Sequence, residues 1–168
     1  MKMLVVSDSH GDQEVLKRIL EVEGEDTQMF FHCGDSLAEY TEMFPFATVK
    51  GNCDFFNKFN KHIELDSPIG YIYVLHGEMG LLNIKRMVKQ LKYKPDIVLY
   101  GHTHIYSHEY HNNVHYFNPG SVSKPRDGTN GTYLIIEGTT KDDIRWEFKK
   151  VETLNNTNIC RLGVKKWD

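Results

Sequence analysis

Short, continuous runs of apolar residues recur along this chain, and each is followed at once by a polar segment. The first two runs lie at residues 3–6 and 29–31, and the apolar residues between 15 and 22 have helical spacing. A run without alternation is typical of a strand that is buried on both faces of a parallel sheet, whereas the helical spacing indicates an amphipathic helix. The chain therefore begins with a strand, a helix and a strand, which restricts it to folds built on a parallel sheet.

Later segments add antiparallel strands to this parallel beginning. We predict a short helix at 37–44, a strand at 47–49, a hairpin of 61–66 and 70–75 about Ser67-Pro68, a helix at 81–91, a strand at 96–100, and hairpins around Asn112-Asn113 and at 138–142. The expected fold class is therefore α/β, with mixed sheets arranged in layers.

Composition limits the size, the partners and the compartment. With 168 residues, of which 40% are hydrophobic, the chain can bury a single core, so we expect one domain at 1–150 and a C-terminal tail at 151–168. The formal net charge of −3 provides no general basic field, so nucleic acid is not favoured as a partner. Three cysteines are too few for a disulfide framework, and the first apolar run is too short for a secretory or membrane segment. We expect a cytoplasmic protein.

Seven residues with metal-binding side chains follow the predicted strands at the point where each strand ends. In chain order they are Asp8, His10, Asp35, Asn52, His76, His102 and His104. Taken singly, most of these motifs are more typical of a helix cap or an ordinary turn. In open α/β sheets, however, the loops at the carboxyl ends of the strands converge on one site. Their joint occurrence in these positions therefore predicts a shared site.

The residue types indicate two metal ions. Two Asp, one Asn and four His form a nitrogen and oxygen donor set that suits manganese, iron, zinc or similar divalent ions. Seven ligands are too many for one ordinary site, whereas two ions about 3.5–4 Å apart use them all if Asp35 bridges the pair. Such a pair lowers the pKa of a bound water toward about 7 and binds phosphoryl oxygens. The predicted reaction is hydrolysis of a phosphate ester by a metal-bridging hydroxide, with Asn52 able to donate its amide hydrogens to the phosphate.

The motifs also resemble a known family. They are Asp8-x-His10, Gly34-Asp35, Gly51-Asn52-Cys53-Asp54, His76-Gly77, Gly101-His102-Thr103-His104 and Asn118-Pro119-Gly120-Ser121. In type, order and spacing this set, which spans residues 1 to about 150, resembles the calcineurin-like metallophosphoesterases. It is most similar to their small bacterial and archaeal phosphodiesterase branch, which is itself similar to a subunit of the eukaryotic retromer.

The resemblance implies a metallo-dependent phosphatase-like fold, a four-layer α/β/β/α sandwich of two mixed sheets flanked by helices. It implies two divalent metal ions, with manganese expected and nickel, zinc or iron as alternatives. By the same resemblance, the first ion is held by Asp8, His10, Asp35 and His104, and the second by Asp35, Asn52, His76 and His102. The residues predicted to take part in catalysis are Asn52, Asp35 and His102.

Cys53 is the one departure from the wider family, in which a His thought to protonate the leaving group usually occupies this position. A thiol, with an ordinary pKa of about 8.5, is only a weak donor. Loss of a general acid typically costs about 10²–10⁴-fold on a poor leaving group. Since Cys is usual here in the small branch, diesters with good leaving groups, such as aryl diesters, are favoured over monoesters. Alternatively, Cys53 is simply a small packed hydrophobe.

Two further features of the sequence each allow two interpretations. Arg126 either binds the substrate phosphate as a bidentate donor or forms a salt bridge within its loop. The segment 118–121 either closes a hairpin or lies near the metals, as in the family it resembles. The remaining histidines are expected to be structural or exposed, namely His32, His62, His108, His111 and His115.

Alternative functions also stay open. The likeness to the retromer subunit allows a non-catalytic interaction scaffold with the same fold, although the presence of all seven ligands favours an enzyme. A phosphomonoesterase or a nuclease is the other alternative. Cys53 argues against the monoesterase, and the acidic balance argues against the nuclease. The expected partner is a small phosphate-ester substrate, with no membrane, and a homodimer is compatible with so small a phosphoesterase.

Overall fold

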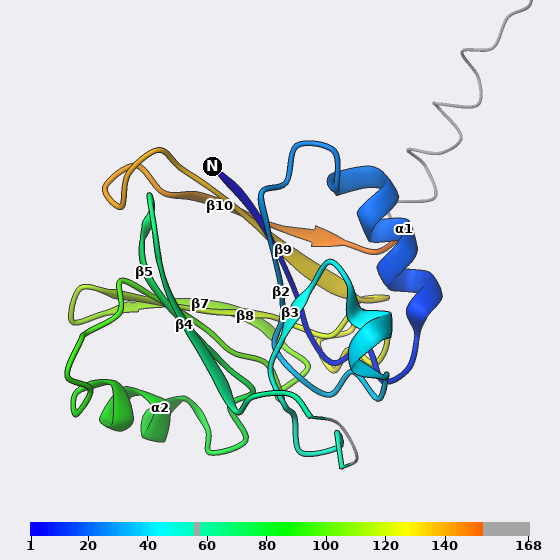
Figure 1. Cartoon of the computed structure of the whole chain (residues 1–168), viewed down its shortest axis with the longest axis horizontal. Helices are drawn as coiled ribbons and strands as arrows, with labels where there is room; N and C mark the ends of the chain where they lie inside the picture. Colours follow the sequence, from blue (N-terminus) through cyan, green and yellow to red (C-terminus); the bar gives the residue numbers. More distant parts are fainter. Residues whose placement is uncertain (56–57, 153–168) are drawn as a thin grey trace, which may run out of the picture.

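The computed structural model describes residues 1–55 and 58–152 of the chain, and within these ranges ten strands form two five-stranded sheets (Figure 1). The first sheet has the order β10-β9-β1-β2-β3 and consists of β10 (Arg145–Lys150), β9 (Thr132–Glu137), β1 (Lys2–Val6), β2 (Met29–His32) and β3 (Ala47–Thr48). The second has the order β4-β5-β6-β8-β7 and consists of β4 (His62–Ser67), β5 (Gly70–Leu75), β6 (Ile97–Leu99), β8 (Val114–Pro119) and β7 (Tyr106–His111).

Both sheets are mixed, as the sequence predicts. In the first sheet β1, β2 and β3 are parallel, and β9 and β10 add antiparallel strands at one side. In the second, β5, β6 and β8 are parallel, with β4 and β7 as antiparallel edge strands. Hairpins join β4 to β5, β7 to β8 and β9 to β10, whereas β9 reaches its place beside β1 from the other sheet and each parallel step requires a longer crossover.

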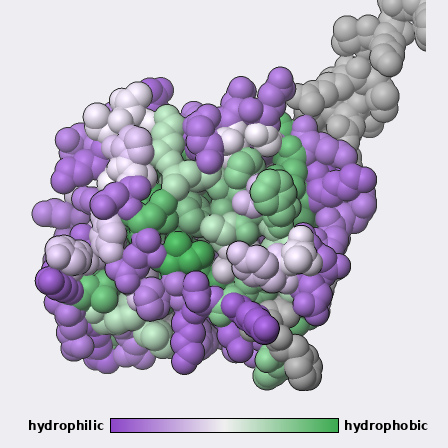
Figure 2. Space-filling view, in the orientation of Figure 1, coloured by the Kyte–Doolittle hydropathy of each residue, from purple (hydrophilic) through white to green (hydrophobic). Residues whose placement is uncertain are grey.

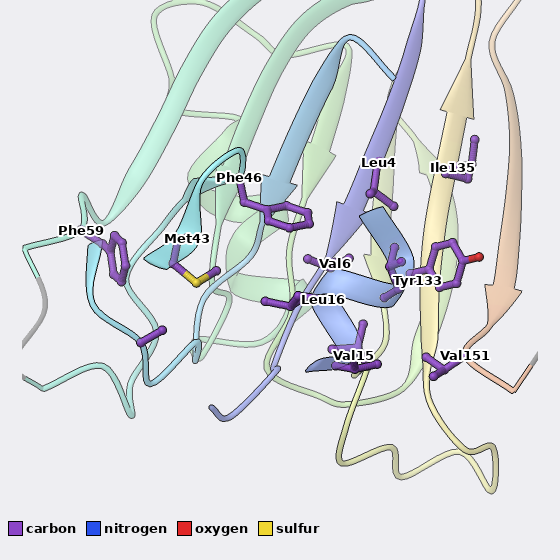
Figure 3. Packing of buried hydrophobic residues seen from close by; sticks show 13 residues of the cluster. Leu4, Val6, Val15, Leu16, Met43, Phe46, Phe59, Tyr133, Ile135 and Val151 are labelled. Atoms are coloured by element: carbon purple, nitrogen blue, oxygen red, sulfur yellow. The ribbon is translucent and has the colours of Figure 1, made fainter. Parts of the chain in front are cut away.

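Three apolar clusters separate four layers, so the predicted α/β/β/α sandwich is confirmed. Met3 and Val5 of β1 point between the two sheets, whereas Leu4 and Val6 point outward to helix α1 (Gln13–Glu23) (Figure 3). Helix α2 (Leu81–Val88) covers the outer face of the second sheet. Because successive side chains of a strand alternate between its faces, one continuous apolar run supplies two of these clusters.

Hydrophobic residues also reach the surface between the two sheets, in the middle of the face shown in Figure 2, where hydrophilic residues surround them. Partly buried side chains at the margin of the central cluster include Met29, Ile63 and Leu65.

The prediction of a helix at 37–44 is wrong in extent. Only Tyr40–Met43 forms a helical turn, of the 3₁₀ type. Leu37 has a φ of 53° and donates its N–H to Asp54, so the helix cannot begin there. Pro45 follows Phe44, whose ψ of 134° is extended, and the residue before a proline is disfavoured in the helical region. Helix α2 likewise ends at Val88, short of the predicted residue 91.

The predicted C-terminal tail at 151–168 lies mostly outside the described residues, apart from the buried Val151 and its neighbour Glu152. Among the helices that the structure describes, none has the length and apolar character needed to cross a bilayer.

Candidate metal centre

The structure brings all seven predicted ligands together at one end of the two sheets. The loop after β1 donates two backbone N–H groups to the loop after β2, from Asp8 to Gly34 at 3.0 Å and from His10 to Asp35 at 3.0 Å. In the second sheet, Gly101 N donates to the His76 carbonyl at 2.8 Å. The ligand-bearing loops thus continue the parallel pairing of the strands that precede them, which explains why they meet at the carboxyl ends of both sheets.

Five of the seven predicted ligands have backbone conformations in the left-handed region. The φ angles are 53° at Asp8, 46° at His10, 57° at Asp35, 70° at His102 and 60° at His104. This region costs an L-residue about 1–2 kcal/mol, although Asp, Asn and His visit it more often than most. Strained conformations gather at functional sites because the surrounding structure holds them there. The loops are therefore shaped to aim these side chains inward, at the expense of backbone stability.

Two glycines of the motifs allow the loops to approach the carboxylates closely. A Cβ at Gly51 would overlap the backbone nitrogen and Oδ1 of Asp35. A Cβ at Gly101 would overlap the Ser7 hydroxyl and lie 2.9 Å from Asp8 Oδ2. These positions need glycine because any side chain would push a ligand-bearing loop out of place.

One group of ligands consists of Asp8, His10 and His104. The Nδ1 of His104 donates to the Lys124 carbonyl at 2.6 Å, so in the neutral ring the Nε2 carries the lone pair. This Nε2 lies 3.3 Å from Asp8 Oδ1 and 3.3 Å from His10 Nε2. Asp8 Oδ1 is buried and accepts no hydrogen bond from any described residue. Two facing imidazole nitrogens and an unsatisfied buried carboxylate oxygen fit a bound cation.

A second group lies beside it. His76 Nδ1 donates to the Cys33 carbonyl at 2.7 Å, so its Nε2 faces the site and offers a lone pair when the ring is neutral. That Nε2 lies 3.0 Å from Asn52 Oδ1 and 3.3 Å from His102 Nδ1. Asn52 Oδ1 is in turn 2.9 Å from His102 Nδ1. Asp35 Oδ2 lies 3.4 Å from His76 Nε2. All four residues of the predicted second set thus converge.

Asp35 lies between the two groups. Its carboxylate falls within 4.8 Å of the donor atoms of Asp8 and His76, and also within that distance of those of His10 and Cys53. Burial would raise the pKa of Asp35, but the interaction with His76, whose Nε2 lies 3.4 Å away, and the hydrogen bond from the Cys53 backbone N–H at 2.7 Å hold it below its usual range. An ionised carboxylate shared by both groups is what a bridging ligand requires.

Asp54 is a functional residue that the sequence analysis quoted in a motif without assigning it a role. It is 1% exposed, and its Oδ2 accepts the backbone N–H groups of Asp35 and Gly51, each at 2.8 Å. Its Oδ1 accepts the Leu37 N–H at 2.8 Å and the Ser36 hydroxyl at 3.2 Å. Asp54 therefore positions Asp35 by tying the loop after β2 to the loop after β3. In the sequence, the only indication of this role was the position of Asp54 two residues after Asn52.

The segment 118–121 does not close a hairpin. Asn118 and Pro119 are the last residues of β8, and the segment borders the ligand loops. The amide of Asn118 donates to the Gly101 carbonyl at 2.8 Å and to the Thr103 hydroxyl at 2.9 Å. Ser121 Oγ donates to the Asp8 carbonyl at 2.8 Å. The alternative drawn from the family resemblance is the one that the structure supports, and these two side chains position the ligand loops.

Cys53 and Arg126, the two candidate substrate residues, both lie beside the ligands. Burial and the neighbouring Asp35 raise the pKa of the half-buried Cys53 thiol to about 11. Arg126 donates its backbone N–H to the His104 carbonyl at 2.9 Å. Its side chain is exposed and takes part in no ion pair recorded among the residues that the structure describes, so it is available to an anionic ligand.

His32, predicted to be structural or exposed, is structural. It is fully buried, and its Nδ1 accepts the Gly34 N–H at 3.2 Å. The Nε2–H must then donate to Ser9 Oγ, at 2.8 Å. Burial lowers the pKa of His32 to about 4, so the ring is neutral at physiological pH.

This buried imidazole predicts a dependence of stability on pH. Between pH 6.5 and pH 4 the unfolded chain binds a proton at His32 that the folded protein excludes, so the free energy of unfolding falls as the pH falls. The expected loss from this residue is about 3 kcal/mol. Urea unfolding of the metal-free protein across this range measures it, with His32→Asn, whose oxygen can still accept from Gly34, as reference. Equal pH slopes for both proteins would exclude this role.

Comparisons with known proteins agree with the geometry. Residues 1–141 match the family model of the calcineurin-like phosphoesterase superfamily domain. The probable metallophosphoesterase YsnB of Bacillus subtilis is 34% identical over 143 residues, which covers 81% of this chain and 83% of that protein. The phosphodiesterase YfcE of Escherichia coli is 26% identical over 166 residues, which covers 82% of this chain and 88% of that protein.

Solved structures share the fold. A predicted phosphoesterase from Streptococcus pneumoniae superposes with a TM-score of 0.77 at 25% identity, covering 90% of each chain. Vacuolar Protein Sorting 29 from Cryptosporidium parvum has a TM-score of 0.69 at 17% identity, covering 89% of this chain and 96% of that one. At such low identity the second likeness concerns the fold alone.

Proposed function

The chain belongs to the calcineurin-like phosphoesterase superfamily, and on that premise we propose that it is a phosphodiesterase that uses two divalent metal ions. The observation that carries the proposal is the convergence of nitrogen and oxygen donor atoms on both sides of Asp35, with a buried oxygen of Asp8 left unsatisfied among the described residues. Groups of this kind repel one another unless cations lie between them. Bringing such groups together without cations is costly, and an interaction scaffold has no need of the arrangement.

The proposed ions would be held by two overlapping sets. One set is Asp8, His10, Asp35 and His104, and the other is Asp35, Asn52, His76 and His102. Two divalent ions so held would lower the pKa of a shared water, supplying hydroxide, and would neutralise charge on the phosphoryl oxygens. The mixed nitrogen and oxygen donors favour manganese, with nickel, zinc or iron as alternatives.

The chain's own groups prepare this site for an anionic ester. Backbone carbonyls bind the Nδ1–H of His76 and of His104, which fixes both rings with Nε2 inward. The amide nitrogen of Asn52 lies 3.4 Å from Cys53 Sγ, a weak acceptor, so that amide can turn to donate to a phosphate oxygen. Arg126 offers a second donor at the rim.

Cys53 determines which esters are cleaved efficiently. In the metal-free protein, burial and the neighbouring Asp35 raise the pKa of the thiol to about 11, so the thiol is protonated there at neutral pH. It is also a weak hydrogen-bond donor, which leaves a departing alkoxide without an effective acid. Diesters with acidic leaving groups are therefore the proposed substrates, in preference to alkyl esters.

Changing Cys53 to His tests this argument. An imidazolium at this half-buried position can donate a proton to the leaving group, so Cys53→His is expected to raise hydrolysis of poor leaving groups by about tenfold or more. The measurement is kcat/KM for phenyl diesters across a range of phenol pKa values. The variant should show a weaker dependence on leaving-group pKa than the wild type. An unchanged dependence would show that this position does not reach the leaving group.

The proposed function is tested by removing and restoring the metal. We expect metal-stripped protein to be inactive and to regain hydrolysis of bis(4-nitrophenyl) phosphate on addition of Mn²⁺, with a lower rate on 4-nitrophenyl phosphate. Folded protein that cleaves neither ester with any divalent ion would overturn the enzyme and support the scaffold. Preference for the monoester would support a phosphomonoesterase instead. We place the activity in the cytoplasm, in keeping with the free thiols of Cys33 and Cys53.

A further inference from the structure

A cavity of about 430 Å³ opens beside Asn52 and His76. Its other walls come from the segment after β3, from Lys61, from β4 and β5, from the loop before α2 and from Met87 of that helix. Its volume falls within the range of small-molecule sites, and its position next to two of the predicted metal ligands makes it continuous with the metal centre. Whatever group of the substrate extends in this direction must enter it.

Two lysines line the cavity side by side. Val49 and Asn60 form a parallel bridge, and Lys50 N donates to the Asn60 carbonyl at 2.8 Å, so the next pair in register is Lys50 and Lys61. Both side chains face the cavity, and neither forms an ion pair with a described residue. Like charges on neighbouring strands destabilise each other. Two lysines in register that line one cavity without acidic partners fit a dianionic group such as a phosphate.

The rest of the wall suits a flat, partly apolar group. The His62 ring stacks on Tyr73 with 5.2 Å between centroids and 9° between planes, and both residues line the cavity. Leu75, Met79 and Met87 supply apolar surface. Glu78 is the one acidic side chain among the described residues of the lining, so the two lysines outweigh it.

We propose that this cavity binds the second ester arm of the diester, and that this arm is a ring-bearing, nucleoside-sized group that carries a phosphate of its own. The ring packs against His62 and the two methionines, and the second phosphate binds Lys50 and Lys61. This inference rests on the proposed function, since it takes the scissile phosphate to lie at the metal centre. The inference identifies the substrate class as short nucleotide-like diesters. The net charge of the whole chain gives no indication of this preference.

Two chromogenic esters with the same leaving group test this assignment. They are the 4-nitrophenyl ester of thymidine 5′-phosphate and the same compound with a 3′-phosphate. With Mn²⁺ we expect KM to be about tenfold lower for the 3′-phosphorylated ester. In the double variant Lys50→Gln, Lys61→Gln the KM ratio of the two esters should fall to about one. Lys141→Gln, which removes a lysine charge at the opposite end of the sheets, should keep the wild-type ratio.

The outcomes separate this inference from the proposed function. Equal KM values in the wild type, or a preference that survives in the double variant, would overturn the inference while leaving a working diesterase. Failure of every diester would overturn the proposed function. In that case, calorimetry on the metal-free protein still tests whether the cavity binds the second phosphate. Thymidine 3′,5′-bisphosphate should bind more tightly than thymidine 5′-monophosphate, and only while both lysines are present. Equal affinities would exclude the lysine pair as a phosphate site.

Discussion

Replacing Asp35 by Asn is expected to lower manganese-dependent diester hydrolysis by about a thousandfold while the protein stays folded. The amide keeps an oxygen that can accept the Cys53 N–H, which Oδ1 now accepts at 2.7 Å. It removes the negative charge that lies within reach of both groups of donor atoms. The measurements are kcat/KM for bis(4-nitrophenyl) phosphate and the number of Mn²⁺ ions retained after dialysis, which should fall with the activity.

Asp143→Asn is the matched control. Asp143 also accepts several hydrogen bonds, from Thr139 and Thr140, but it lies in the turn between β9 and β10, at the far end of the sheets. This variant should retain wild-type activity and metal content. A fully active Asp35→Asn enzyme would contradict the bridging role, because a neutral amide cannot replace a shared carboxylate. A variant that is inactive but keeps both ions would confine the role to catalysis.

Replacing Asp54 by Ala is expected to cause the largest loss of stability. Four donors lose their acceptor, namely the N–H groups of Asp35, Leu37 and Gly51 and the hydroxyl of Ser36. The site is 1% exposed, so water does not readily replace the carboxylate. Each unsatisfied buried donor costs about 1–3 kcal/mol, and partial relaxation leaves an expected total of about 3–5 kcal/mol. Urea unfolding measures the free energy directly.

The control for this variant is Asp66→Ala, on an exposed position of edge strand β4, which should change stability by less than about 0.5 kcal/mol. If Asp54→Ala unfolds like the wild type, the loops after β2 and β3 are held by other contacts. Metal affinity should also fall in the folded variant, because the backbone of Asp35 is no longer tied to Gly51. That second measurement separates a positioning role from a purely structural one.

Much of the fold could be predicted because it depends on local pattern. The run at 3–6 has no polar residue, so β1 had to be buried on both sides, and Met3 and Leu4 indeed lie in different clusters. The hairpin about Ser67-Pro68 followed from its turn chemistry. The helix predicted at 37–44 is wrong in extent because the Leu37 N–H donates to Asp54, which lies 17 residues away in the sequence. The local pattern carries no sign of this contact.

For the site, the sequence by itself determined which donor types follow the ends of the strands, and hence the chemistry that they suit. Only the tertiary structure decided how they are held. Asp8 meets the His102 backbone across 94 residues, and the carbonyls that orient His76 and His104 come from other loops. The pairing of Lys50 with Lys61 likewise depends on a bridge between separate segments. Left-handed backbones and ring orientations are imposed by such distant contacts, and local sequence does not encode them.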